Sequence, residues 1–216
     1  TCPLVTKVHM EVRKHAKASK DIILVGHKGH PEVEGTMGRH INSDNSSIYL
    51  VQNELDAKNI KINNPTKLAL VTQTTLSVDE TKSIIDILKY RFPDIDIPKK
   101  DDICYATQNR QDAVKQLALE SDFMIVVGSK NSSNSNRLSE LAEKCGCRSI
   151  LIDEFTDIDL DDLNKYSKIS ITAGASAPES KVMEIAKSLE LYADAEIIEH
   201  GEDNEDIYFK LPPGLR

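Results

Sequence analysis

The feature that most constrains the fold is a pattern that occurs twice along the chain, beginning each time with a cysteine. Cys2 and Cys104 are each followed by a stretch of helical character and then by an apolar run that ends in glycine, 24 residues after the cysteine in both copies. A second apolar run ends at Thr72 in the first copy and at Thr172 in the second. A period of about 100 residues predicts duplicated domains that each bring one thiol to a shared centre. The alternative is that both residues are ordinary buried cysteines.

The composition excludes several classes of protein. Of 216 residues, 39% are hydrophobic and 29% charged, which suits a soluble globular chain of one large or two small domains. No apolar run reaches membrane-spanning length, and we expect neither a signal peptide nor a membrane partner. The net charge of −8 disfavours a nucleic-acid surface, because phosphate backbones require a cationic face. Four cysteines without a secretory segment favour reduced thiols or metal ligands over disulfides.

Strands and helices are expected to alternate in both copies. In the first copy we expect helices over 3–19, near 54 and over 78–91, strands over 22–26, 48–51 and 68–72, and a polar loop over 27–35. In the second we expect helices over 109–120, 137–144 and 178–191, strands over 123–127, 149–152 and 168–172, and a polar loop over 128–136. This pattern predicts the α/β class, with two pseudo-repeated parallel-sheet domains over 1–100 and 101–192 and C-terminal strands and a tail over 193–216.

The first residues, Thr1-Cys2-Pro3, have no apolar strand before them. Every other loop of the pattern follows a strand, so we expect the chain to begin in mid-architecture, with one further domain of the same kind absent from it. Ligands of parallel α/β sheets bind outside the carboxyl ends of the strands. The polar loops should therefore meet at one rim of the molecule.

One of these loops is rich in anion-binding groups. Ser132, Ser133 and Asn134 lie directly before a predicted helix, and Ser176 lies before the next. Hydroxyl, amide and free N–H groups at a helix start suit an anion such as phosphate. Simple helix capping is the alternative, above all for Ser176. In the cluster, capping cannot occupy every group, so we favour ligand binding there.

Another loop combines a histidine with a carboxylate. His30 and Glu32 follow the strand over 22–26 and could relay protons at a substrate, or could be solvated loop residues. Thr74 follows the strand over 68–72, where it could equally be a turn or cap hydroxyl. Cys145 and Cys147 do not have the spacing of a standard zinc site, so we interpret them as structural thiols.

Six ordered motifs together resemble the hydroxymethylbutenyl diphosphate reductases, the last enzymes of the methylerythritol phosphate route to isoprenoids. They are TCPLV at 1–5, GHPEVEGT at 29–36, TQTTLS at 72–77, DICYAT at 102–107, GSKNSSNSN at 128–136 and TAGASAP at 172–178. Each motif alone is weak, but the ordered set spans nearly the whole chain and is highly specific.

The resemblance implies an architecture and a chemistry. The family has three α/β domains in pseudo-threefold arrangement around a central [4Fe-4S] cluster, and each domain gives one cysteine. By resemblance, Cys2 and Cys104 are two of the three ligands, and the third is not in this chain. The implied reaction is the reductive dehydroxylation of (E)-4-hydroxy-3-methylbut-2-enyl diphosphate to isopentenyl and dimethylallyl diphosphate, with electrons from ferredoxin or flavodoxin. The implied location is a bacterial cytoplasm or a plastid-type organelle.

The resemblance also implies roles for individual residues. Glu32 would be the catalytic proton source, with Thr74 helping to pass the proton. His30 would bind the substrate near its hydroxyl and diphosphate, and the diphosphate oxygens would be bound by Ser132, Ser133, Asn134 and Ser176. The competing hypothesis is a truncated, non-catalytic diphosphate-binding module without a cluster.

Overall fold

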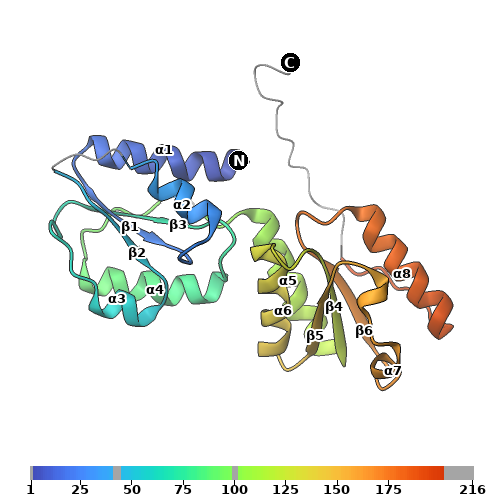
Figure 1. The fold of residues 1–216 in the computed structure, drawn as a ribbon. Coiled ribbons are helices and arrows are strands. Elements are labelled where there is room, and N and C mark those ends of the chain that lie inside the picture. Colours follow the sequence, from blue (N-terminus) through green and yellow to red (C-terminus); the bar gives the residue numbers. More distant parts are fainter. Residues whose placement is uncertain (1, 41–44, 99–101, 202–216) are drawn as a thin grey trace, which may run out of the picture.

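The computed structural model describes residues 2–40, 45–98 and 102–201, which form two α/β units joined near residue 100 (Figure 1). The first unit contains α1 (Pro3–Lys17), β1 (Asp21–Val25), α2 (Pro31–Met37), β2 (Ile48–Val51), α3 (Glu54–Asn59), β3 (Leu68–Thr72) and α4 (Val78–Arg91). The second contains α5 (Tyr105–Glu120), β4 (Phe123–Val127), α6 (Ser133–Lys144), β5 (Arg148–Ile152), η1 (Phe155–Asp157), α7 (Leu160–Leu163), β6 (Ile169–Ala173) and α8 (Glu179–Ala193).

Both units are built on the same sheet. The strand orders are β2-β1-β3 and β5-β4-β6, and every pair is parallel. The first strand of each unit is therefore central, and the next two strands flank it. This confirms the predicted α/β class with two repeated parallel sheets. The predicted domain boundary at residue 100 lies outside the described residues.

The central strands are buried on both faces, as their continuous apolar sequences require. In β1, Ile22 and Leu24 pack with α1, while Ile23 and Val25 pack with the cluster that includes Leu88 of α4. β4 repeats this alternation, because residues 124 and 126 pack with α5 and α6 while residues 123, 125 and 127 pack on the opposite face with α8. A period of two on a double-sided sheet produces two core layers in each unit.

Three expectations about helix starts were wrong. α2 occupies part of the expected loop over 27–35, because Pro31 suits the first helical position and Val33 and Thr36 become buried. α5 begins at Tyr105 rather than near 109, because the sulfur of Cys104 caps it. α6 begins at Ser133, inside the expected loop over 128–136.

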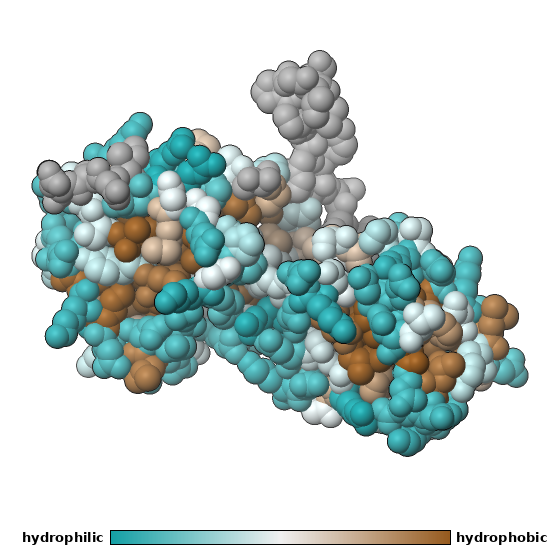
Figure 2. Space-filling model, viewed as in Figure 1, coloured by the Kyte–Doolittle hydropathy of each residue, from teal (hydrophilic) through white to brown (hydrophobic). Residues whose placement is uncertain are grey.

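The C-terminal segment also differs from the expectation. Residues 195–200 carry no strand, and Ile197 and Ile198 are 41% and 77% exposed. The rest of the expected C-terminal strands and tail, over 202–216, lies outside the described residues. Within residues 2–40, 45–98 and 102–201, no helix is both long and apolar enough to cross a membrane. Figure 2 shows mainly hydrophilic side chains on the viewed face, with hydrophobic residues in separate areas on each unit.

The core of the first unit depends on Leu88, which is fully buried. Leu88→Ala should lower the free energy of unfolding of this unit by about 2–5 kcal/mol, because it leaves a cavity between α4 and the sheet. Urea unfolding followed by circular dichroism measures this change. Leu55→Ala is the control, since Leu55 is 67% exposed and its loss should change stability by less than about 0.5 kcal/mol. Equal effects of the two substitutions would contradict the packing described.

Candidate active site

The loops after the parallel strands of both units meet near Thr74. The backbone N–H of Cys104 donates to the carbonyl of Thr74 at 3.0 Å. Two residues earlier, Asp102 accepts a 3.0 Å hydrogen bond from the backbone N–H of Thr72 and a 3.1 Å ion pair from Lys7 of α1. The start of the second unit is thereby fastened both to the carboxyl end of β3 and to the helix that follows Cys2.

The two cysteines have the same local structure. Cys2 is the N-cap of α1, and its sulfur accepts the backbone N–H of Val5 at 3.5 Å. Cys104 is the N-cap of α5, and its sulfur accepts the backbone N–H of Thr107 at 3.2 Å. Both thiols are free, Cys2 is exposed and Cys104 is half-buried. Helix starts favour negative charge, so both sulfurs stand where a metal-bound thiolate would be stabilised.

Two hydrogen bonds join Glu32 and Thr74. The backbone N–H of Thr74 donates to Oε1 of Glu32 at 2.7 Å, and the Thr74 hydroxyl contacts Oε2 at 3.1 Å. Burial raises the pKa of Glu32, the two hydrogen bonds from Thr74 oppose that rise, and the nearby Asp102 charge adds to it. A carboxyl group with a raised pKa keeps its proton closer to neutral pH, which is the property a proton donor needs.

His30 is fixed by the helix that it caps. Its Nδ1 accepts the backbone N–H of Glu32 at 3.2 Å, so the proton of the neutral ring is on Nε2. Burial lowers the pKa of His30, which favours this neutral form. His30 therefore offers one N–H donor beside Glu32. His30 and Glu32 lie side by side at the start of α2, and their roles stay predictions.

The start of α6 is only partly explained by capping. Ser132 is the N-cap, and its hydroxyl accepts the backbone N–H of Ser135 at 3.3 Å. Asn134 is 5% exposed, and among the described residues its Nδ2 and Oδ1 have no hydrogen-bond partner. A buried unpaired amide is costly, and a ligand oxygen at this helix start would accept a hydrogen bond from its Nδ2. Ser176, in contrast, is exposed and is not the cap of α8, which begins after Pro178.

Two glycines let α6 approach the carboxyl ends of its sheet. A β-carbon at Gly128 or Gly174 would lie 2.3 or 2.0 Å from the hydroxyl oxygen of Ser135, which is far inside contact distance. Both positions therefore exclude a side chain, and the helix start reaches the ends of β4 and β6 for that reason.

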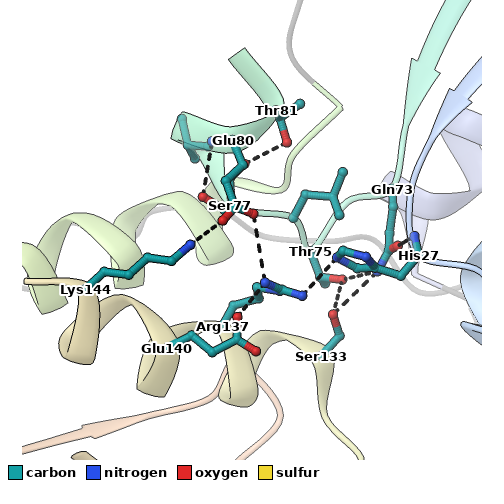
Figure 3. Close-up of polar contacts among 12 residues, drawn as sticks. His27, Gln73, Thr75, Ser77, Glu80, Thr81, Ser133, Arg137, Glu140 and Lys144 are labelled. Atoms are coloured by element: carbon teal, nitrogen blue, oxygen red, sulfur yellow. Dashed lines mark hydrogen bonds and ion pairs between the residues drawn. The ribbon is translucent and has the colours of Figure 1, made fainter. Parts of the chain in front are cut away.

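A set of polar contacts that the sequence did not reveal joins the two units (Figure 3). The hydroxyl of Ser133 contacts Gln73 and Thr75. One turn along α6, Arg137 contacts Nε2 of His27 at 3.0 Å and lies 3.9 Å from Glu80, which also pairs with Lys144. The only signal in the sequence is that Gln73 and Thr75 flank Thr74 in one motif.

One groove on the described surface lies outside these contacts. It has a volume of about 730 Å³ and is formed by residues of α2, β2 and α3, including Val33, Met37, Leu50 and Ile60. Its floor is largely apolar, and neither Glu32 nor the start of α6 lines it. The candidate site therefore rests on the convergent polar groups and not on the size of a cavity.

The described residues fit an iron–sulfur cluster only in part. Cys2 and Cys104 are free thiols at equivalent helix starts, which suits two ligands of a shared cluster. In the part of the chain that the structure describes, no group of three or more His, Cys, Asp or Glu side chains is arranged to hold a metal ion. These residues alone do not complete a metal site.

Comparison with known proteins shows which family the chain belongs to. A family model described as LytB protein matches residues 1–190. The 4-hydroxy-3-methylbut-2-enyl diphosphate reductases of Saccharophagus degradans and Chromohalobacter salexigens are 54% and 55% identical over 216 residues, which cover 100% of this chain and 70% and 68% of those proteins. The solved E-1-hydroxy-2-methyl-but-2-enyl-4-diphosphate reductase from Plasmodium falciparum is 38% identical with a TM-score of 0.81, over 88% of this chain and 58% of that chain.

The chain therefore belongs to the LytB protein family, and the resemblance predicted from the six motifs is confirmed. Its close relatives are enzymes named as diphosphate reductases. The chain spans 70% of the first of these relatives and 58% of the solved P. falciparum chain.

The raised pKa of Glu32 has a consequence for stability. A carboxyl group whose pKa is higher in the folded than in the unfolded chain contributes stability that is complete below the unfolded value and is lost as pH rises through the folded value. The difference in free energy of unfolding between the native chain and Glu32→Gln should therefore fall as pH rises above the ordinary glutamate value of 4.5. Urea titrations of both proteins between about pH 4.5 and 8 measure this difference. A difference that stays constant or increases with pH would contradict the environment described for Glu32.

The close approach of α6 can be tested at Gly174. Gly174→Ala should lower the free energy of unfolding by about 1–3 kcal/mol, because the new methyl group overlaps Ser135. Adding Ser135→Ala should recover part of this loss, since it removes the overlapped oxygen. Gly35→Ala in α2 is the control, because its nearest neighbour is 3.7 Å away and alanine favours a helix. A Gly174→Ala protein as stable as the control would show that α6 lies further from the sheet.

Proposed function

We propose that this chain acts in an iron–sulfur reductase that converts (E)-4-hydroxy-3-methylbut-2-enyl diphosphate to isopentenyl and dimethylallyl diphosphate. The observation that carries the proposal is the double role of Thr74. Its N–H and hydroxyl hold the carboxyl group of Glu32, and its carbonyl holds the backbone of Cys104. A proton source and a candidate cluster ligand are thereby bonded to the same residue.

The proposed reaction balances with two electrons and two protons. The C–O bond of the allylic alcohol breaks, the oxygen leaves as water, and a C–H bond forms at either end of the allyl system. Ferredoxin or flavodoxin would supply the electrons one at a time. When bound by Cys2, Cys104 and a third cysteine outside this chain, a [4Fe-4S] cluster would pass on these electrons and act as a Lewis acid on the alcohol oxygen.

The residues of this chain would bind the substrate and hold its protons. Burial raises the pKa of Glu32, which suits a proton donor, and the Thr74 hydroxyl is in contact with its Oε2 at 3.1 Å. His30 would donate from Nε2 to the substrate between its hydroxyl and its diphosphate. The diphosphate oxygens would be bound by Ser132, Ser133 and Asn134 at the start of α6, and by Ser176 before α8. The unpaired amide of Asn134 supports an acceptor at this place.

A second candidate function is a diphosphate-binding module without catalysis. The observation that favours it is that the described residues supply two candidate thiolate ligands and no group of three. Both hypotheses use the same anion site at α6, so they differ in whether the chain binds iron.

For the reductase we propose a location in a bacterial cytoplasm or a plastid-type organelle, in keeping with the family resemblance.

The decisive variant for the reductase is Glu32→Gln. Full-length protein that includes the third cysteine, prepared without oxygen and supplied with iron and sulfide, should be brown, and should reduce the allylic alcohol with dithionite and a viologen mediator. Glu32→Gln should lower kcat by about 10²–10⁴-fold with the fold and iron content unchanged, because the amide cannot deliver the proton. Glu34→Gln is the matched control, since Glu34 lies on the same helix but is exposed.

The outcomes separate the two functions. A colourless, iron-free and inactive full-length protein that includes the third cysteine would overturn the reductase. The binding module would then be tested by titrating the present chain with inorganic diphosphate, and the absence of saturable binding would overturn it as well.

A further inference from the structure

We propose that Gln73 and Thr75 are positioning residues that orient the hydroxyl group of Ser133 toward an anion at the start of α6. This inference rests on the proposed diphosphate site and adds to it a directed chain of hydrogen bonds that begins in the first unit and ends in the second (Figure 3). This series of hydrogen bonds runs from His27 through Gln73 and Thr75 to Ser133.

The orientation of the Gln73 amide is fixed by its neighbours. Gln73 is 1% exposed, and its Oε1 accepts the backbone N–H of His27 at 3.1 Å. A backbone N–H only donates, so the atom that faces it must be the amide oxygen. The amide nitrogen therefore points the other way, toward Thr75 at 3.0 Å and Ser133 at 3.4 Å.

That nitrogen fixes the direction of its own bonds, and the contact geometry fixes that of the Thr75–Ser133 bond. Nε2 of Gln73 only donates, so the hydroxyl oxygen of Thr75 is its acceptor. The Thr75 hydroxyl then donates to Oγ of Ser133 at 3.1 Å. Ser133 thus accepts from Thr75 and, over a longer distance, from Gln73. Both lone pairs of its oxygen are engaged.

What remains to Ser133 is its single O–H, which has to donate elsewhere. Ser133 is half-buried at the first position of α6, beside Ser132 and the unpaired amide of Asn134. Phosphate oxygens only accept, so an anion at this helix start fits a hydroxyl that can only donate. Successive hydrogen bonds in one direction polarise each other, which strengthens the last one.

A pair of substitutions at Thr75 tests this role. Thr75→Val keeps the shape of the side chain and removes its hydroxyl, whereas Thr75→Ser keeps the hydroxyl. Titration calorimetry of the full chain with inorganic diphosphate should show roughly three- to tenfold weaker binding for Thr75→Val, as expected for the loss of one supporting hydrogen bond. Thr75→Ser should bind within about twofold of the native chain.

A double-mutant cycle separates orientation of Ser133 from a general loss of structure. In a Ser133→Ala background, Thr75→Val should cause no further loss of diphosphate affinity, because the hydroxyl that it orients is gone. A loss of the same size in both backgrounds would assign Thr75 a merely structural role and overturn the inference. Native-like affinity of the Thr75→Val single variant would overturn it too.

The result for the native chain distinguishes this inference from the function on which it rests. If the native chain binds diphosphate and Thr75→Val has no effect, only the orienting role fails. If the native chain shows no saturable binding, the proposed diphosphate site fails, and the orienting role fails with it.

Discussion

The three hydrogen bonds of Thr74 hold the candidate site together. This residue follows β3, is 3% exposed, and uses its N–H, its hydroxyl and its carbonyl in contacts with other segments. Two of these contacts reach Glu32 at the start of α2, and the third reaches Cys104 at the start of α5. A strand end, two helix starts and both units are thereby fixed relative to one residue, so the site depends on backbone geometry that a rigid parallel sheet provides.

The pKa of Glu32 is raised because the effect of burial is larger than that of its hydrogen bonds. A carboxylate that accepts two hydrogen bonds ordinarily has a low pKa, because both bonds favour the charged form. Around Glu32 the cost of burying the charge outweighs the two bonds from Thr74, and Asp102 adds repulsion. The two hydrogen bonds from Thr74 therefore hold the carboxyl group of Glu32 in one orientation. This combination of a held position and a raised pKa suits proton transfer more than structural support.

How much the sequence predicts depends on how much of a segment's structure is local. The strands at 68–72 and 123–127 and the helix over 78–91 were predicted to the residue, because apolar runs and the Ser77 cap define them. α2 was missed because a helix of seven residues with two buried side chains has too short a pattern. The start of α5 was misplaced because cysteine is not among the usual N-cap residues.

The candidate site likewise has contacts that the sequence predicts and contacts that it does not. The neighbourhood of His30, Glu32 and Thr74 followed from the rule that strand ends share a rim. The contacts of Ser133 with Gln73 and Thr75 did not, because they depend on how two units with separate cores pack together. No periodicity within one unit carries that information, and the family motifs mark the residues without giving their directions.

The proposed function depends above all on where the diphosphate substrate lies. A crystal structure of the chain, prepared without oxygen and bound to (E)-4-hydroxy-3-methylbut-2-enyl diphosphate, would test this position most directly. We expect the diphosphate at the start of α6, in contact with Ser133 and Asn134, and the alcohol carbon beside Glu32 and Thr74. A ligand bound instead in the groove between α2, β2 and α3, with Asn134 still unpaired, would contradict the account.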